Sequence, residues 1–278
     1  MHKSIMDIVA VKNTGKKITV LTSFDHTFAS MCDAVGIDIL LVGDSAGMVA
    51  LGYDDTTKVT MDQMCLFTRA VSRARKNALI VSDMPFMSYQ PGLQEAVRNA
   101  GMLISAGADA VKVEGGAHIV PIVRELVETG IPVMGHIGVQ PQTATMNAGY
   151  TAHGMTKESA LDLIADADKL AQAGIFALTL EMVAAQTANI ITERIPVPTI
   201  GIGSGPKCDG QVLVTQDMLG MYEKINTRFI KRYLDREISE ALGRYCKDVQ
   251  DGIFPNDENS YLMDSAELKA LDAELGKK

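Results

Sequence analysis

Short runs of Val, Ile and Leu alternate with longer, partly polar segments along most of the chain. Eight such apolar runs occur, at Ile18–Phe24, Ile39–Val42, Ala78–Ser82, Ala110–Val113, Pro132–Gly135, Phe176–Leu180, Thr199–Ile202 and Gln211–Thr215. Most of them are apolar at nearly every position, which is typical of parallel strands that are covered on both faces. The pattern therefore predicts eight buried strands.

Segments with the periodicity of amphipathic helices lie between most of these strands. They are predicted at Met61–Lys76, Gly92–Ala106, Ile119–Thr129 and Lys157–Ala173, with a further helix at Thr227–Asp251 after the last strand. Thr60 and Thr156 are candidate N-caps, and the glycines that follow the helices are candidate stops. Eight strands alternating with helices favour a single-domain α/β fold, the (β/α)₈ TIM barrel, over an open doubly wound sheet. No GxGxxG motif joins the first strand to the first helix, which also argues against a dinucleotide-binding sheet.

No linker interrupts the chain. We predict a barrel domain over residues 1–262 and a C-terminal tail, helical in composition, over residues 263–278. Within the tail, Ser265–Gly276 is either a solvated terminal helix or a lid or subunit contact.

The net charge and the cysteine content indicate which partners and which cellular compartment to expect. The net charge of −8 argues against nucleic-acid or anionic-membrane partners. The four cysteines form no CxxC pair, which favours reduced thiols. No apolar run has the length of a signal peptide or a membrane span, so we expect a cytoplasmic protein.

Polar and ionisable residues stand at the ends of successive predicted strands. They are Asp25, Asp44 with Ser45, Asp83, Lys112 with Glu114, His136, Glu181 and the turn Gly203–Ser204–Gly205. The carboxyl ends of barrel strands form the face that carries the chemistry of this fold. Crowded carboxylates repel one another, and a hard divalent cation is the simplest remedy. The pattern predicts a metal-dependent active site at this face.

Each residue also has a structural interpretation. Asp44 and Asp83 could cap turns, and His136 could be a hydrogen-bonded structural histidine. Lys112 could pair with Glu114 or another carboxylate of the same face instead of a substrate carboxylate. The glycine-flanked Ser204 is either an anion-binding nest or a tight turn. Recurrence at six successive strand ends favours a functional role for the set.

This set of residues suits the chemistry of 2-oxo acids. Mg²⁺ on Asp44 and Asp83 would bind the keto and carboxylate oxygens and stabilise the enolate that forms when C3 loses a proton. Lys112 would neutralise the substrate carboxylate, and Glu181 would take or return the C3 proton.

At these residues the chain resembles the ketopantoate hydroxymethyltransferase family. The matching segments are LLVGDSAGM (40–48), VSDMPFMSY (81–89), AVKVEGG (110–116), VMGHIGVQPQT (133–143), GIFALTLEMV (174–183) and PVPTIGIGSG (196–205). The resemblance implies Mg²⁺-dependent transfer of a hydroxymethyl group from 5,10-methylenetetrahydrofolate to C3 of 3-methyl-2-oxobutanoate, which yields 2-dehydropantoate for pantothenate biosynthesis. It also implies a homo-oligomer, decameric in many members.

The resemblance assigns roles to individual residues. Asp44 and Asp83 match metal-site aspartates that also approach the substrate, and Glu114 matches a glutamate that completes the metal site directly or through water. Ser45 and Lys112 match residues that bind substrate oxygens. Glu181 matches the proposed base, and His136 a histidine close to the transferred carbon.

The chain departs from the family pattern in its loops. In AGYTAHGM (148–155), Thr151 and Met155 replace basic residues, and Gln216 replaces a histidine after the eighth strand. We expect the first loop to contact the acid or the folate, the alternative being a cover whose side chains face solvent. The alternative activities are a related Mg²⁺-dependent 2-oxo acid aldolase or lyase with a different acid or one-carbon partner, and a barrel that only binds or scaffolds. The cysteine-containing KKCGH-like loop of isocitrate lyases is absent from the sequence.

Overall fold

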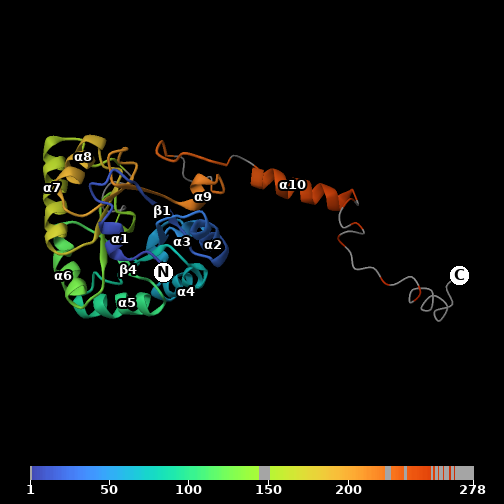
Figure 1. Cartoon of the computed structure of the whole chain (residues 1–278), viewed down its shortest axis with the longest axis horizontal. Coiled ribbons are helices and arrows are strands. Elements are labelled where there is room, and N and C mark those ends of the chain that lie inside the picture. The colour runs from blue at the N-terminus through green and yellow to red at the C-terminus, as the bar shows by residue number, and fades with distance from the viewer. Residues whose placement is uncertain are drawn as a thin grey trace. The chain divides into compact units, whose positions relative to one another are not determined.

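The computed structural model confirms the barrel (Figure 1). It describes residues 2–143, 151–222, 227–234 and 237–251, together with the single positions 253, 256, 259, 263 and 266. Parallel strands pair in sequence order and β8 closes on β1, with Val20 of β1 opposite Val212 of β8. Closure leaves no sheet edge, and all strand carboxyl ends therefore meet at one face.

The strands lie close to the predicted runs, with ends shifted by up to three residues. They are β1 (Ile18–Thr22), β2 (Ile39–Val42), β3 (Leu79–Asp83), β4 (Ala110–Glu114), β5 (Val133–Gly138), β6 (Ala177–Glu181), β7 (Thr199–Ile202) and β8 (Gly210–Leu213). The strands β2 to β5 are buried at every position, as their largely apolar composition predicts.

Helices ring the strands (Figure 1). Those of the barrel are α1 (Ile5–Val9), α2 (His26–Ala34), α3 (Ala46–Val49), α4 (Met61–Ala74), α5 (Leu93–Ser105), α6 (Val120–Glu128), α7 (Lys157–Gln172), α8 (Ala185–Arg194) and α9 (Thr215–Met218), with 3₁₀ turns η1 (Thr56–Lys58), η2 (Ala117–Ile119) and η3 (Pro141–Thr143). The predicted caps are confirmed: Thr60 accepts from the N–H of Gln63, and Thr156 accepts from the N–H of Ser159. Gly107 and Gly174 follow α5 and α7 with positive φ, a backbone conformation that other residues rarely adopt.

Alternation along the strands separates two apolar clusters. Ile39 and Leu41 of β2 belong to the cluster inside the barrel, whereas Leu40 and Val42 pack against the helices. Ile8 of α1 joins the inner cluster, which also contains Ile18 of β1. The side chains that point into the barrel are therefore apolar in its lower layers.

The chain divides into two compact units, Met1–Lys231 and Arg232–Lys278. Every barrel strand lies in the first unit, so the barrel needs no residue beyond 231. The predicted boundary at residue 262 and the helix at Ser265–Gly276 fall on a stretch that lies mostly outside the described residues. None of the helices in the described part of the chain has the length and hydropathy of a membrane span.

Two helix predictions need correction. The helix predicted at Thr227–Asp251 begins only at Glu237, as α10 (Glu237–Gln250), and residues 227–234 are not helical. α10 has no buried residue. The helices α2 and α8 were not located from the sequence. Asp25 caps α2 by accepting from the N–H of Phe28, and this strand-end carboxylate is thus structural.

Candidate active site

A cavity of about 510 Å³ opens at the carboxyl ends of the strands. Its wall contains all of the predicted site residues: Asp44, Ser45, Asp83, Lys112, Glu114, His136 and Glu181. The volume lies within the range of roughly 300–1,000 Å³ that is usual for small-molecule sites. Residues from β2 to β6, far apart in sequence, are thus brought into one pocket.

Strand alternation explains why these side chains face the cavity. In β4, Ala110 belongs to the inner apolar cluster, so Lys112 and Glu114 point the same way. In β6, Ala177 of the inner cluster places Glu181 on the inner side as well. The polar top layer therefore continues the apolar layers beneath it.

Asp44 and Asp83 lie side by side at the ends of β2 and β3. The backbone N–H of Asp44 donates to Asp83 Oδ2 at 3.1 Å. Burial, followed by the negative charges of Asp83 and Glu114, raises the pKa of Asp44 well above its usual range. A Cβ on Gly43 would lie 3.0 Å from Ser45 Oγ, so a side chain there would require the Ser45 hydroxyl to shift by a few tenths of an ångström. The aspartates are thus forced together in a place where a second negative charge is unfavourable.

Lys112 is buried between carboxylates. Its Nζ lies 2.7 Å from Asp83 Oδ1 and 3.9 Å from Glu114 Oε1. Burial opposes its charge, but the carboxylates of Asp83, Glu114 and Asp44 raise its pKa above the usual range. Lys112 therefore remains a cation, and its partner on this face, which the sequence left open, is Asp83.

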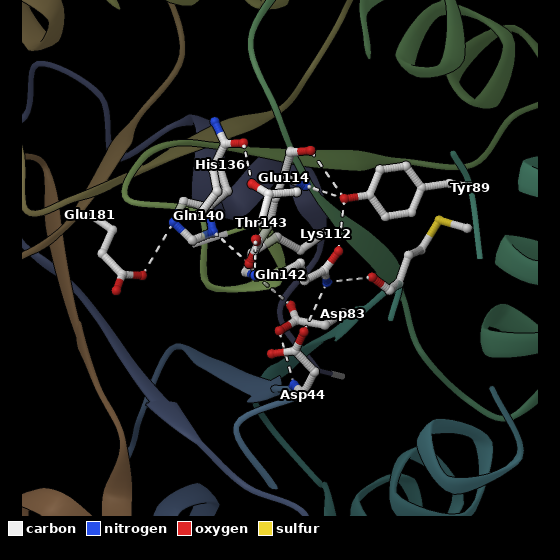
Figure 2. A network of polar contacts seen from close by, with 11 residues as sticks. Asp44, Asp83, Tyr89, Lys112, Glu114, His136, Gln140, Gln142, Thr143 and Glu181 are labelled. Atoms are coloured by element: carbon white, nitrogen blue, oxygen red, sulfur yellow. Dashed lines mark hydrogen bonds and ion pairs between the residues drawn. The ribbon is translucent and has the colours of Figure 1, made fainter. Parts of the chain in front are cut away.

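His136 bridges two glutamates (Figure 2). Its Nδ1 lies 3.3 Å from Glu114 Oε1, and its Nε2 lies 3.3 Å from Glu181 Oε2. Burial alone would lower the pKa of His136, but the charge of Glu114 and the contacts with both glutamates raise the pKa to about 9. The imidazole is therefore a cation at neutral pH, with no nitrogen left to accept a proton.

Two further polar residues, Gln142 and Tyr89, support the charged residues but do not line the cavity. The sequence did not identify them as site residues. Gln142 donates from Nε2 to Asp44 Oδ2 at 2.8 Å, and the hydroxyl of Tyr89 lies 3.0 Å from Gln142 Oε1. Both residues occur in matched segments, VMGHIGVQPQT and VSDMPFMSY. Gln142 and Tyr89 are uncharged and lie outside the strands, so the pattern of charges at strand ends could not identify them. Only their contacts in the structure show that they belong to the site.

The donor set suits a hard divalent cation held by two carboxylates. The linked groups Asp44, Asp83, Lys112, Glu114, His136 and Glu181 comprise four carboxylates and two cations, so their formal charges leave an excess of negative charge. Within the described ranges no group of three or more His, Cys, Asp or Glu residues is arranged to hold a metal ion. Mg²⁺ is commonly held by one or two carboxylates, with water and substrate as the remaining ligands. Asp44 and Asp83 fit that pattern.

Other predicted features have structural roles. Ser204 accepts from the N–H of Val183 and donates to Leu180 O at 2.7 Å, so its hydroxyl ties β6 to the turn after β7. Thr151 and Met155 are exposed and do not belong to the cavity wall. These positions match the alternative of a cover whose side chains face solvent. Residues 148–150 of that loop lie outside the described residues.

Solved structures share the fold at low sequence identity. The chain is similar to a phosphoenolpyruvate phosphomutase from Streptomyces platensis subsp. rosaceus, with a TM-score of 0.62, 13% identity and coverage of 99% of this chain and 98% of that one. It is similar to an oxaloacetate acetylhydrolase with the same TM-score, identity and coverage. At such identity the likeness shows the fold alone.

Other proteins match the chain at much higher sequence identity. The family model for ketopantoate hydroxymethyltransferase matches residues 2–257. A 3-methyl-2-oxobutanoate hydroxymethyltransferase from Nitrosopumilus maritimus is 56% identical over 278 residues, covering 99% of this chain and 100% of the relative. Enzymes of the same name from Cenarchaeum symbiosum and Clostridium novyi are 54% and 46% identical, covering 92% and 98% of this chain and 98% and 100% of their own lengths. A match of this extent shows that the chain belongs to the ketopantoate hydroxymethyltransferase family and is a hydroxymethyltransferase.

Proposed function

We propose that the enzyme transfers a hydroxymethyl group from 5,10-methylenetetrahydrofolate to C3 of 3-methyl-2-oxobutanoate, yielding 2-dehydropantoate for pantothenate biosynthesis. The relatives' name supplies the acid and the group transferred. The observation that carries the proposal is the continuous set of charges from Asp44 to Glu181 along one cavity wall. Such a set can bind an anionic acid at one end and move a proton at the other.

The acid binds at the end of the cavity that holds Lys112 and Ser45. The buried ammonium of Lys112 neutralises the substrate carboxylate, and the hydroxyl of Ser45 donates to a substrate oxygen. The branched end of the acid lies against the apolar part of the wall, which includes Leu41, Ile202 and Val212. Charge at one end and apolar surface at the other fix the orientation of the acid.

The metal site belongs to Asp44 and Asp83, with Glu114 acting through water. Mg²⁺ bound there would supply a Lewis acid that favours loss of the C3 proton. Both oxygens of Glu114 are already engaged, Oε1 with His136 and Lys112 and Oε2 with the N–H of Gln142. Glu114 therefore contributes charge and orientation rather than a free lone pair aimed at the ion.

Glu181 takes the C3 proton. It stands at the end of β6, lines the cavity and remains partly exposed, with 14% of its side chain accessible. His136 lies 3.3 Å away and is protonated, so it holds the carboxylate in place without competing for the substrate proton. C3 then bonds to the methylene carbon of the donor, whose two bonds to folate nitrogens break. Water supplies the hydroxyl group, and the C3 proton and the other water proton go to the two nitrogens, so that tetrahydrofolate leaves.

Proton exchange separates the two halves of this reaction. The protein with Mg²⁺ and 3-methyl-2-oxobutanoate in D₂O is followed by NMR at C3, with and without 5,10-methylenetetrahydrofolate. Exchange together with transfer supports the full proposal, and exchange alone supports a different one-carbon partner. Absence of both would refute the proposal. Asp44→Asn with Asp83→Asn should abolish Mg²⁺-dependent exchange at unchanged circular dichroism, and wild-type turnover by that variant would refute the metal assignment.

We also propose that the enzyme is a homo-oligomer in the cytoplasm. α10 places apolar residues on one helical stripe, and Leu242 and Val249 are 63% and 45% exposed. Apolar stripes of this kind favour burial against another surface. Cys246 carries an exposed free thiol, which suits a reducing compartment. Light scattering coupled to size-exclusion chromatography tests the assembly, and a monomer would refute it.

A further inference from the structure

Gln142 and Tyr89 form a buried polar pair behind the charged wall of the cavity. Gln142 is 2% exposed and Tyr89 is 1% exposed, and neither residue lines the cavity. Gln142 belongs to η3, after β5, and Tyr89 lies between β3 and α5. Burying polar groups this deeply lowers stability unless their hydrogen bonds are made. The hydrogen-bond partners of the pair therefore indicate its role.

Gln142 contacts the carboxylates of Asp44 and Glu114 (Figure 2). Its Nε2 donates to Asp44 Oδ2 at 2.8 Å and to Met84 O at 2.9 Å, and its backbone N–H donates to Glu114 Oε2 at 3.1 Å. Because a carboxylate and a carbonyl can only accept, the amide nitrogen must face them. The amide has therefore one orientation, and in it both N–H groups are used.

Tyr89 fixes that orientation from the other side. Its hydroxyl accepts from the N–H of Glu114 at 3.1 Å and lies 3.0 Å from both Gln142 Oε1 and Glu114 O, either of which can take its proton. Tyr89 thus joins the backbone of Glu114 to the side chain of Gln142. One connected group determines where Asp44 and Glu114 point.

We propose that Gln142, held by Tyr89, is a positioning residue that sets the divalent-cation affinity of the site through Asp44 and Glu114. The inference rests on the proposed metal site. Gln142 uses up one oxygen of Asp44 and one oxygen of Glu114 on the side away from the cavity. Asp44 then keeps Oδ1 for the cavity, whereas Oε1 of Glu114 stays beside His136 and Lys112. Groups that hold metal ligands in this way typically alter metal affinity by roughly 10–100-fold when removed.

A purely structural role would give a different result. Gln142 also ties η3 to Met84 next to β3, and this contact alone could make the residue important for folding. A structural role predicts loss of stability with unchanged ion affinity in the folded molecules. A positioning role predicts loss of ion affinity beyond any change in stability.

The chain offers a matched control in the same segment. Gln140 lies two residues before Gln142, and its Oε1 accepts from Thr143 Oγ1 at 3.4 Å (Figure 2). It does not line the cavity. Gln140→Met and Gln142→Met therefore make the same chemical change in one loop, but only Gln142→Met removes the side-chain donor to Asp44. The backbone N–H that donates to Glu114 is present in both variants.

The experiment measures Mn²⁺ binding to the substrate-free full chain by electron paramagnetic resonance. Mn²⁺ has the same preference for oxygen ligands as Mg²⁺. We expect Gln142→Met to weaken binding by about 10-fold or more, Tyr89→Phe to weaken it by a smaller factor, and Gln140→Met to leave it unchanged. Thermal unfolding of each ion-free variant shows that the fold is retained, and Tyr89→Phe decides the question if Gln142→Met does not fold.

The outcomes are distinguishable. Equal Mn²⁺ affinity in wild type, Gln142→Met and Tyr89→Phe would overturn the positioning role while leaving the proposed function intact. Failure of wild type to bind Mn²⁺ would overturn the metal part of the proposed function, and this inference with it. Weakening by Gln140→Met as large as that by Gln142→Met would assign the effect to the loop as a whole and also overturn the proposal.

Discussion

Lys112 and Asp83 are opposite each other in the β3–β4 ladder, and Lys112 Nζ lies 2.7 Å from Asp83 Oδ1. Register and strand alternation together bring the two charges into contact on the inner side of the barrel. Their side chains are 5% and 4% exposed, so solvent does little to screen the pair. The contact holds the Lys112 ammonium in the cavity wall, where we propose that it neutralises the substrate carboxylate.

We predict that Lys112→Met lowers the free energy of unfolding of the ion-free protein by about 3–5 kcal/mol, because it leaves a buried carboxylate without its partner. Adding Asp83→Asn should recover part of this loss, since the unpaired charge is then removed. Urea unfolding of both variants at pH 7 measures the difference. A double variant no more stable than Lys112→Met would show that the pair is not the cause.

The sequence could predict this pair's location but not its contact. Alternation places residues 83, 112, 114 and 181 inside the barrel once the strands are known, and the fold rule places them at its active face. The partner of Lys112 depends on the register of β3 against β4, which no local pattern encodes. The contacts of loop residues such as Gln142 could not be predicted either, because they depend on how η3 packs against β4. The helix α10 was predicted too long because composition does not show where its first turn begins.

Asp44→Asn should stabilise the ion-free protein while it abolishes cation binding. Since the pKa of Asp44 is raised in the folded state, the folded state holds this proton more tightly than the unfolded chain does. The wild type therefore loses stability as pH rises from the ordinary aspartate range through the folded pKa, by about 1.4 kcal/mol for each unit of difference. The variant lacks this loss, and its advantage should grow with pH.

Thermal unfolding of wild type and Asp44→Asn from pH 4 to pH 8, with and without Mg²⁺, checks this expectation. Mg²⁺ should stabilise the wild type, because it binds only the folded state, and should leave the variant unchanged. A variant that is less stable than the ion-free wild type at pH 8 would contradict the view that the carboxylates repel one another.

His136 should titrate with a midpoint of about 9. Its folded pKa is higher than the ordinary value of about 6.5, so the stability that it contributes is complete below that value and is lost as pH rises through the folded pKa. NMR of the imidazole protons, assigned with His136→Gln, measures the midpoint. Glu181→Gln should lower it, because one of the two carboxylates beside the ring is removed. A midpoint below the ordinary value would mean that burial outweighs both glutamates.

The loop that departs most from the family pattern should have little effect on substrate affinity. Its backbone is fastened to the end of β6: the N–H of His153 donates to Met182 O at 2.9 Å, and His153 O accepts from Ala184 at 2.9 Å. The side chain of Met155 is 70% exposed, and Thr151 is exposed as well. Charges at such positions contribute about 0–1 kcal/mol to an interaction, because water screens them.

Thr151→Lys with Met155→Arg restores the basic residues and tests whether they matter here. We expect the Michaelis constants for 3-methyl-2-oxobutanoate and for 5,10-methylenetetrahydrofolate to change by less than about 3-fold, which corresponds to roughly 0.7 kcal/mol. Repeating the measurement at high salt provides the control, since any small gain from surface charge should vanish. A salt-resistant gain of about 10-fold or more, worth about 1.4 kcal/mol, would mean that these side chains turn inward onto a bound substrate. In that case the loss of two basic residues would mark a real change in what the site accepts.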